Sequence, residues 1–448
     1  MLKRAFALFL VIISLFSVSA YADETPEIFG KSAILIDADT GRVLYSKNPD
    51  AKVFPASTTK IMTAILVIEN CQDKMGEIVV ASEVVNTIIG TGASNIGILP
   101  GEEMTVEQLL YAVLLASANE ACDVLAEFVC NGNVSEFVSL MNKKAEELGM
   151  ENTNFVNTHG FHEDNHYTTA NDMALLAKYA MQNETFRKIV KTEDYVLPKT
   201  NKYTFNGGER ILSNTNDIIK PVNSNYYKYA TGIKTGYTSQ AGNCLVASAT
   251  KESTESATKS SMNLIAATFN SQSEDNDSRK NTDVINLFKY GFNNFSMVSV
   301  SVPNEEVGEV PVFAGNGADS VTAVVSSEVK ALLPSGVDIK TDIKRVCTYY
   351  EEVKAPVKKG DKVGTIEYKL IDKKTGEEIT VGEADLVAKT DISRNWFKVI
   401  FTGIKNILLS PFVVVPVILF FVFVLILIYM RNLRKKKRRR YFKKRRYR

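Results

Sequence analysis

The chain has 448 residues, 45% of them hydrophobic and 23% charged, which predicts about three globular domains, and no fewer than two, and excludes a disordered, collagen-like or disulfide-knotted chain. Its net charge of +2 hides an asymmetry. Of the 53 Lys and Arg residues, thirteen lie in 431–448 and two in 1–22, so the remainder has 38 basic against 51 acidic residues. We expect no nucleic-acid partner, because phosphate contacts need clustered positive charge. The five cysteines are widely spaced and form no Cys-x-x-Cys pair, which argues against a disulfide scaffold and a zinc ribbon.

Residues 1–22 have the pattern of a secretory signal peptide. Lys3 and Arg4 form a positive start, 5–16 form a short apolar core, and Ala20-Tyr21-Ala22 supplies a small-x-small cleavage site. We therefore expect the mature chain to begin at Asp23 and its body to be exported. An uncleaved N-terminal anchor is the alternative, although the apolar core is short for a membrane span.

Residues 23–292 have a mixed α/β pattern. Apolar runs of strand length occur first at 32–36 and 42–46, on either side of the turn Asp39-Thr40-Gly41. Helical spacing of apolar residues follows in four segments, 57–70, 106–130, 135–148 and 170–181. Strand-like runs return at 232–238, 243–250 and 262–269, and a helix over 283–292 closes the unit. The polar tract 251–261 predicts a solvated loop between two strands.

Residues 293–392 predict a small all-β domain. Short alternating apolar runs at 298–302, 309–313, 340–346 and 365–370 are separated by turn signals such as Lys359-Gly360-Asp361. This part holds no constellation of catalytic residues, so we interpret it as a spacer or scaffold between the α/β unit and a membrane.

The C-terminus predicts a membrane anchor in three parts. Residues 393–406 mix aromatic and aliphatic residues with Arg and Lys, as an amphipathic juxtamembrane segment does. Residues 407–430 carry no charge and are long enough for a transmembrane helix across a hydrocarbon core of about 30 Å, with Pro411 and Pro416 in the first half. The basic tail 431–448 follows at once. Positive charge stays on the cytoplasmic side, so we expect the body of the chain outside and a short cytoplasmic tail.

Three short motifs lie in or beside apolar elements of the α/β unit. Ser57-Thr58-Thr59-Lys60 enters a predicted helix, where residues i and i+3 share a face, so the Lys60 amine can reach the Ser57 hydroxyl. A serine becomes a strong nucleophile when a base takes its proton, and a neutral lysine can be that base. Ser117-Ala118-Asn119 ends an apolar run. Lys234-Thr235-Gly236 lies in a predicted strand, where a small residue would let a substrate backbone follow the strand edge. Alone, Ser57 could equally be a helix cap.

Each triplet also occurs elsewhere in the chain, so their order and surroundings carry the signal. Only the three chosen motifs give Ser-x-x-Lys, Ser-x-Asn and Lys-Thr-Gly in this order within one α/β unit. The other matches fall in polar loops and turns, in the β domain or next to the membrane segment, and they begin at Ser46, Ser248, Ser256, Ser261, Ser327, Lys374 and Ser393.

The ordered set resembles the penicillin-recognising serine enzymes. Longer strings at 35–41, 55–63, 157–172, 232–238 and 355–360 resemble the low-molecular-mass D-alanyl-D-alanine carboxypeptidases, and the resemblance extends over residues 28–390. It implies an α/β (α+β) serine transpeptidase-like catalytic domain, the all-β domain behind it, and neither cofactor nor metal.

The resemblance also implies a mechanism on peptidoglycan stem peptides ending in D-Ala-D-Ala. Ser57 would attack the penultimate D-alanine, Lys60 would accept the proton, and Ser117 would relay it to the departing D-alanine. Asn119 would bind the substrate amide, while Lys234 and Thr235 would hold the terminal carboxylate beside Gly236. Backbone N–H groups of Ser57 and Tyr237 would form the oxyanion hole. Lys234 would help keep Lys60 neutral. Arg279 is a further candidate for the carboxylate, and β-lactams would acylate Ser57.

Three alternatives remain open at this stage. A serine β-lactamase shares the nucleophile and lysine, but it needs a well-placed deacylating water, and no matching glutamate motif lies between Ser117 and Lys234. A weakly active penicillin-binding scaffold of the wall machinery would have the same motifs. His159, His162 and His166 lie close enough to suggest a metal site, although the resembled family uses that segment structurally.

Overall fold

A computed structural model describes residues 25–88, 91–252, 261–271, 273–274, 277–371 and 376–445. The expected signal peptide, most of the polar loop 251–261 and the last residues of the basic tail lie outside this part of the chain. The described residues form two compact units. The first runs up to Val298 and includes Leu332–Val337, and the second comprises Ser299–Ala331 and the residues from Asp338 onward. The division at Val298 lies six residues beyond the expected one.

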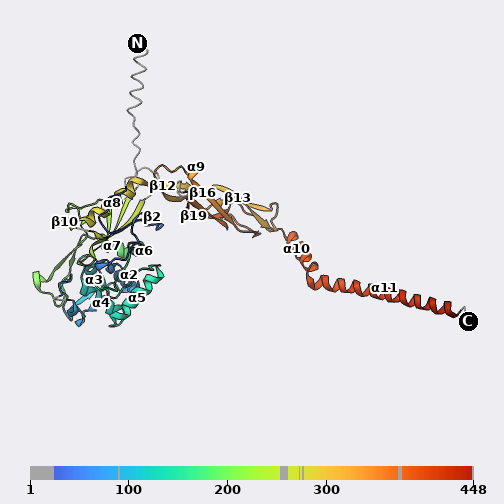
Figure 1. Cartoon of the computed structure of the whole chain (residues 1–448), viewed down its shortest axis with the longest axis horizontal. Coiled ribbons are helices and arrows are strands. Elements are labelled where there is room, and N and C mark those ends of the chain that lie inside the picture. Colours follow the sequence, from blue (N-terminus) through green and yellow to red (C-terminus); the bar gives the residue numbers. More distant parts are fainter. Residues whose placement is uncertain are drawn as a thin grey trace, which may run out of the picture. The chain divides into compact units, whose positions relative to one another are not determined.

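The first unit is built around a five-stranded sheet in the order β2-β1-β9-β8-β7, with all neighbouring strands antiparallel (Figure 1). Its strands are β1 (Ser32–Asp37), β2 (Val43–Lys47), β7 (Ala230–Thr238), β8 (Gly242–Glu252) and β9 (Ser261–Ser271). Lys251, Glu252 and Ser261 therefore belong to strands, and the expected loop is shorter than predicted at both ends.

Both faces of this sheet are covered, which explains the continuous apolar run of β1. Ile34 and Ile36 point into a core formed with helices α2 to α7, whereas Ala33 and Leu35 point into a second core against α8. The helices are α2 (Lys60–Asn70), α3 (Val106–Leu114), α4 (Asn119–Val129), α5 (Val134–Glu147), α6 (Ala170–Ala180), α7 (Glu184–Lys191) and α8 (Arg279–Asn294).

Two features of the helices differ from the prediction. The expected helix over 106–130 is interrupted, because Ser117 has a positive φ of 60° and α4 starts only at Asn119. Helix α7 was not predicted, since its eight residues give too short a window for a clear period. Short strand pairs at the edge of the unit join β3 (Ile78–Val80) to β4 (Glu103–Thr105), β5 (Asp194–Leu197) to β6 (Arg210–Ser213), and β10 (Ser273–Glu274) to β11 (Asp277–Ser278).

The second unit holds a six-stranded sheet in the order β16-β18-β19-β14-β13-β17. Its strands are β13 (Glu306–Phe313), β14 (Ser320–Val325), β16 (Ile343–Tyr349), β17 (Val353–Lys354), β18 (Lys362–Ile371) and β19 (Glu378–Ala388), while β12 (Phe295–Ser301) pairs with β15 (Val329–Pro334). The expected strand over 340–346 begins only at Ile343, because Asp338 caps a helical turn, α9 (Ile339–Asp342).

The C-terminal residues form two helices, α10 (Trp396–Leu408) and α11 (Pro411–Arg445). The expected span from Ile407 is therefore misplaced at its start: Ile407 and Leu408 end α10, and Pro411 opens α11, where a missing N–H costs nothing. Residues Pro411–Lys437 make a helix long and apolar enough to cross a membrane.

Candidate active site

The residue before Ser57 is held in an unfavourable backbone conformation. Ala56 has a φ of 48°, in the left-handed region that costs a residue with a Cβ about 1 kcal/mol. A chain of hydrogen bonds holds the Ala56 carbonyl. The Val156 N–H donates to His166 Nδ1, so the proton of the His166 ring is on Nε2, which lies 2.8 Å from Thr59 Oγ1. Thr59 Oγ1 in turn donates to Ala56 O at 2.8 Å. Thr59 and His166 thereby fix the turn that carries Ser57.

Lys60 opens helix α2 one turn after Ser57, and its side chain is fully buried. Its Nζ lies 3.1 Å from Ser57 Oγ and 2.7 Å from the carbonyl oxygen of His159, and it also contacts Asn119 Oδ1. The oxygens of His159 and Asn119 are carbonyl oxygens, which can accept hydrogen bonds but cannot donate them. A neutral amine with two N–H groups satisfies these two acceptors and leaves its lone pair toward the Ser57 hydroxyl.

The electrostatics of two buried lysines favour a neutral amine. Burial lowers the pKa of Lys60, while Cys122, Glu120 and Asp123 act in the opposite direction. Burial also holds the pKa of Lys234 well below its usual range, and the charge of Lys60 adds to this effect. Burial is thus the cause of the lowered pKa of Lys60, and the like-charge effect is found on Lys234 rather than on Lys60.

Ser117 and Asn119 stand at the junction of α3 and α4. The Ala118 N–H donates to Ala112 O and the Asn119 N–H donates to Ser94 O, both within 3.0 Å. These two backbone hydrogen bonds stabilise the break between the helices. The positive φ of Ser117 is the second strained position of the site. Helix α4 starts at Asn119, and this places the Asn119 side chain against Lys60.

The Lys-Thr-Gly motif lies on edge strand β7 beside Ser57. A Cβ added at Gly236 would lie 3.1 Å from Ser57 N and 3.0 Å from Pro55 O, so the strand passes directly along the turn that carries Ser57. This close approach leaves no room for a side chain and requires a glycine here. Thr235 Oγ1 lies 2.7 Å from Thr215 Oγ1, and Lys234 Nζ donates to Thr235 O at 3.1 Å.

A cavity of about 640 Å³ opens above these motifs. Six of the eight expected site residues line it, while Lys60 and Lys234 lie buried beneath. None of the described lining residues is acidic, which suits a ligand with a terminal carboxylate. The lining residues are Ser57, 91–94, Ser117, Asn119, 160–162, Thr215, 235–240 and Lys280.

Several lining residues were missed by the sequence reasoning. Lys280 lines the cavity in place of the expected Arg279, whose guanidinium lies 4.1 Å from the centre of the Phe29 ring. Thr215 comes from a segment without a recognisable pattern. Gly160 was assigned only a structural role, yet a Cβ there would lie 1.8 Å from Ala56 O. The local sequence could not show whether Arg279 or Lys280 lines the cavity, because this depends on the direction of helix α8.

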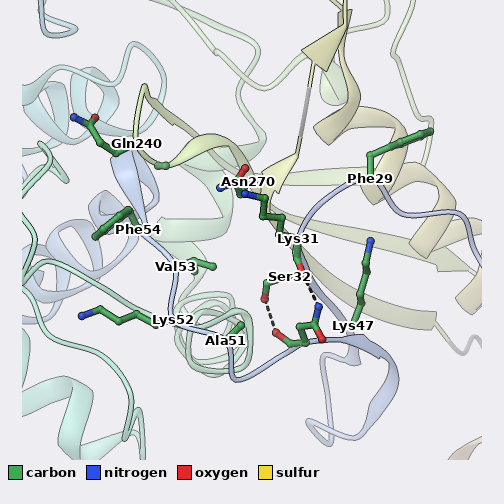
Figure 2. A pocket seen from close by; sticks show the side chains of 12 residues that line it. Phe29, Lys31, Ser32, Lys47, Ala51, Lys52, Val53, Phe54, Gln240 and Asn270 are labelled. Carbon is green, nitrogen blue, oxygen red and sulfur yellow. Dashed lines mark hydrogen bonds between the residues drawn. The ribbon is translucent and has the colours of Figure 1, made fainter.

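A second cavity of about 560 Å³ shares only Gln240 with the first and contains Lys31, Lys47 and Lys52. Figure 2 shows these lysines pointing in different directions. Lys47 Nζ donates to Ile28 O at 2.6 Å, and Lys52 Nζ lies 3.9 Å from the centre of the Tyr167 ring. The three ammonium groups therefore do not converge on one anion.

The three histidines are engaged separately. His166 holds Thr59, His162 Nε2 lies 3.5 Å from Asp164, and His159 Nε2 lies 3.9 Å from Asp123. Within the described part of the chain, no group of three or more His, Cys, Asp or Glu side chains could hold a metal ion.

Comparisons with known proteins agree with this geometry. Residues 19–273 match the family described as D-alanyl-D-alanine carboxypeptidase, and residues 295–394 match the C-terminal domain of penicillin-binding protein 5. The chain is 36% identical to the D-alanyl-D-alanine carboxypeptidase DacF of Bacillus subtilis (strain 168) over 88% of this chain and 96% of that one. It is 30% identical to DacA of Escherichia coli (strain K12), over 84% and 90%.

Solved structures give the same result. Penicillin-binding protein 5 of Haemophilus influenzae has a TM-score of 0.63 at 28% identity, covering 83% of this chain and 99% of that one. A peptidoglycan synthesis regulatory factor (PBP3) of Streptococcus pneumoniae has a TM-score of 0.67 at 25% identity, covering 82% and 100%. The chain therefore belongs to the D-alanyl-D-alanine carboxypeptidases, serine hydrolases among the low-molecular-mass penicillin-binding proteins.

Proposed function

We propose that Ser57 is the nucleophile of this carboxypeptidase and Lys60 its general base. The observation that carries the proposal is the 3.1 Å contact between Lys60 Nζ and Ser57 Oγ, with the other two contacts of the amine made to carbonyl oxygens. Such an amine can take the serine proton in the transition state, which is the step that makes a hydroxyl reactive.

The substrate is a peptidoglycan stem peptide that ends in D-Ala-D-Ala. Its terminal carboxylate binds at Lys234 and the Thr235 hydroxyl, with Lys280 adding positive charge at the cavity wall. This negative charge favours the protonated form of Lys234, and a protonated Lys234 disfavours a second charge on Lys60. Binding of substrate therefore keeps Lys60 in the neutral form that can accept the Ser57 proton.

The reaction proceeds through an acyl-enzyme. Ser57 Oγ forms a bond to the carbonyl carbon of the penultimate residue while its proton passes to Lys60. The C–N bond to the terminal D-alanine then breaks, and Ser117 relays the proton to the leaving amine. Asn119 holds the substrate amide while it also contacts Lys60. Water finally adds to the ester carbon, and Ser57 is released.

Negative charge on the substrate oxygen is stabilised by the backbone N–H groups of Ser57 and Tyr237. The close approach of Gly236 to Ser57 N supports this assignment, because it brings the two backbones side by side. Fixed donors of this kind contribute about 3 to 4 kcal/mol each to a transition state. A β-lactam is attacked in the same way, but its leaving nitrogen stays tethered within the acyl group.

We further propose the arrangement of the whole chain at the membrane. After a signal peptide (1–22), the catalytic domain (23–292) and the all-β domain (293–392) face the outside. The amphipathic segment (393–406) leads into the transmembrane helix (407–430 by sequence, with the helix itself starting at Pro411), and the basic tail (431–448) faces the cytoplasm. Protease added to intact spheroplasts or protoplasts should then digest the body and leave a short membrane fragment, whereas a protected body would contradict this orientation.

The assignment of nucleophile and base is tested with a fluorescent penicillin and the full chain in detergent. Mass spectrometry of the digest should find the adduct on the peptide containing Ser57. Lys60→Met keeps an unbranched side chain in the buried site but removes the base, so acylation should slow by about 10² to 10⁴-fold. A cooperative melting transition of the variant, measured beside the wild type, shows that the chain still folds without the buried amine. An adduct on another residue, or rapid acylation of the variant, would contradict the proposal.

A further inference from the structure

Asp123 is a buried carboxyl behind the active site that belongs to none of the three motifs. It lies in the second turn of α4, is 7% exposed, and does not line the catalytic cavity. Thr158 Oγ1 donates to its Oδ1 at 2.5 Å, and His159 Nε2 lies 3.9 Å from its Oδ2. The Phe161 N–H donates to His159 Nδ1, so the proton of the neutral ring is on Nε2, toward Asp123.

The same two residues contact helix α2 on their other side. Thr63 Oγ1 donates to the carbonyl of Thr158 at 2.5 Å, and Lys60 Nζ donates to the carbonyl of His159 at 2.7 Å. Residues 158–159 therefore form a bridge, with the carboxyl of Asp123 at one end and the amine of Lys60 at the other.

Four ionisable groups face this carboxyl. Lys60 on α2 is the cation, Glu120 and Glu127 on α4 are carboxylates, and His159 comes from the loop after α5. Burial and the charge of Lys60 lower the pKa of His159 to about 3, so His159 adds no charge near neutral pH. Burial raises the pKa of Asp123 to about 6, against the hydrogen bond from Thr158 and the charge of Lys60, while Glu127 and Glu120 raise it further.

We propose that Asp123 is a positioning residue for the general base: through Thr158 and His159 it fixes the carbonyl that holds Lys60, and its negative charge adds to that of Glu120 in the surroundings of Lys60. This inference rests on the proposed role of Lys60. An ionised Asp123 favours protonated Lys60, whereas a neutral residue at the same place leaves Lys60 with a lower pKa. The basicity of Lys60 is then coupled to a carboxyl that itself titrates.

The pH dependence of acylation separates this role from a purely structural one. The second-order rate constant for a fluorescent penicillin is measured from pH 4 to 9 on the full chain in detergent. In Asp123→Asn the Thr158 hydroxyl keeps an acceptor but the charge is lost. The acid limb of the profile, where Lys60 loses its proton, should move to lower pH by about half a unit or more.

Two further variants make the test specific. Thr158→Val removes the hydrogen bond that stabilises the ionised carboxyl, so the acid limb should move in the same direction by a smaller amount. Glu127→Gln is the matched control. It removes the carboxylate one turn further along α4, which accepts from Ser82 at 2.5 Å, and because its loss favours the ionised form of Asp123, the acid limb should not move to lower pH.

The outcomes are distinct. An acid limb at the wild-type pH in both Asp123→Asn and Thr158→Val, with melting temperatures near that of wild type, overturns the role of Asp123 alone. If Asp123→Asn does not fold, an unshifted limb in Thr158→Val overturns it. A wild-type chain that forms no adduct at Ser57 at any pH would instead overturn the proposed function.

Discussion

At the scale of single residues, the proposed mechanism depends on keeping one buried amine neutral. An ammonium group loses its hydration on burial, and this lowers the pKa of Lys60 without any neighbouring cation. Two carbonyl oxygens use its N–H groups, and Ser57 remains for the lone pair. The sequence suggested that the like charge of Lys234 lowers the pKa of Lys60. The pKa is instead lowered by burial, which a sequence motif cannot predict.

The pair Thr215 and Thr235 gives a prediction at this scale. Their hydroxyl oxygens lie 2.7 Å apart, so Thr215 orients the hydroxyl that we assign to the substrate carboxylate. Thr215→Val should raise KM for a D-Ala-D-Ala peptide by about fivefold with little change in kcat, since one neutral hydrogen bond contributes about 1 kcal/mol. Thr215→Ser keeps the hydroxyl and should behave as wild type. An unchanged KM in the valine variant would show that the contact does not affect binding.

At the scale of elements, the site forms where three backbones approach closely. The turn before α2, the break between α3 and α4, and strand β7 each carry a residue whose backbone position is fixed by a neighbour. Ala56 and Ser117, both with positive φ, lie next to or within the catalytic motifs. Local strain is commonly retained at functional sites where the surrounding structure compensates for it.

Gly160 tests this close packing. Its φ is 86°, and an added Cβ would lie 1.8 Å from Ala56 O and 2.8 Å from Thr59 Oγ1. Gly160→Ala should lower the melting temperature and slow penicillin acylation, because the turn carrying Ser57 must move. Gly149→Ala is the control, with a similar φ of 74° and no atom within 4 Å of the added Cβ.

The control should show only the conformational cost, about 1 kcal/mol, or roughly 2 to 4 °C in a unit of this size. The fall for Gly160→Ala should be at least twice that of Gly149→Ala. Equal falls, with acylation unchanged in both variants, would show that Gly160 does not support the nucleophile turn.

How far the sequence could predict the elements follows from their length and contacts. Strong periodicity over ten or more residues located α2, α5, α6 and the three long strands to within a few residues. The interruption at Ser117 was missed, because apolar residues continue across it and only contacts with Ala112 and Ser94 reveal the break. Lys280 and Thr215, which line the cavity with Ser57, and Asp123, which contacts Thr158 and His159, were missed because these contacts depend on tertiary packing rather than local spacing.

At the scale of the whole molecule, buried ionisable groups link stability to pH. The pKa values of His159 and His166 are lowered by burial to about 3 and about 4, so the unfolded chain binds two more protons than the folded one between about pH 6.5 and 4. The pKa of Asp123 is raised to about 6, so below pH 6 the folded chain binds one more proton at this group than the unfolded chain does, which is the opposite effect. The stability contributed by the two neutral histidines should therefore fall as pH decreases through this range, while Asp39, Glu120 and Asp172, whose pKa values are raised by burial, act in the same direction as Asp123.

His166→Gln tests this linkage. Because the variant has no imidazole to keep neutral, the pH dependence of its unfolding free energy should be smaller by about 1.4 kcal/mol per pH unit between pH 6 and 4.5. The measurement is urea unfolding of the full chain in detergent, followed through the fluorescence of a bound penicillin adduct. Equal slopes for variant and wild type would contradict the assignment of a neutral, buried His166.

The central claim is that Ser57, activated by Lys60, removes the terminal D-alanine through an acyl-enzyme. Release of D-alanine from a diacetyl-Lys-D-Ala-D-Ala peptide by the full chain in detergent, beside Ser57→Ala, tests it most directly. We predict steady release by the wild type and none by the variant, with both proteins showing the same melting temperature. Release that persists in Ser57→Ala, or a folded wild type that binds penicillin covalently and releases no D-alanine, would contradict the account.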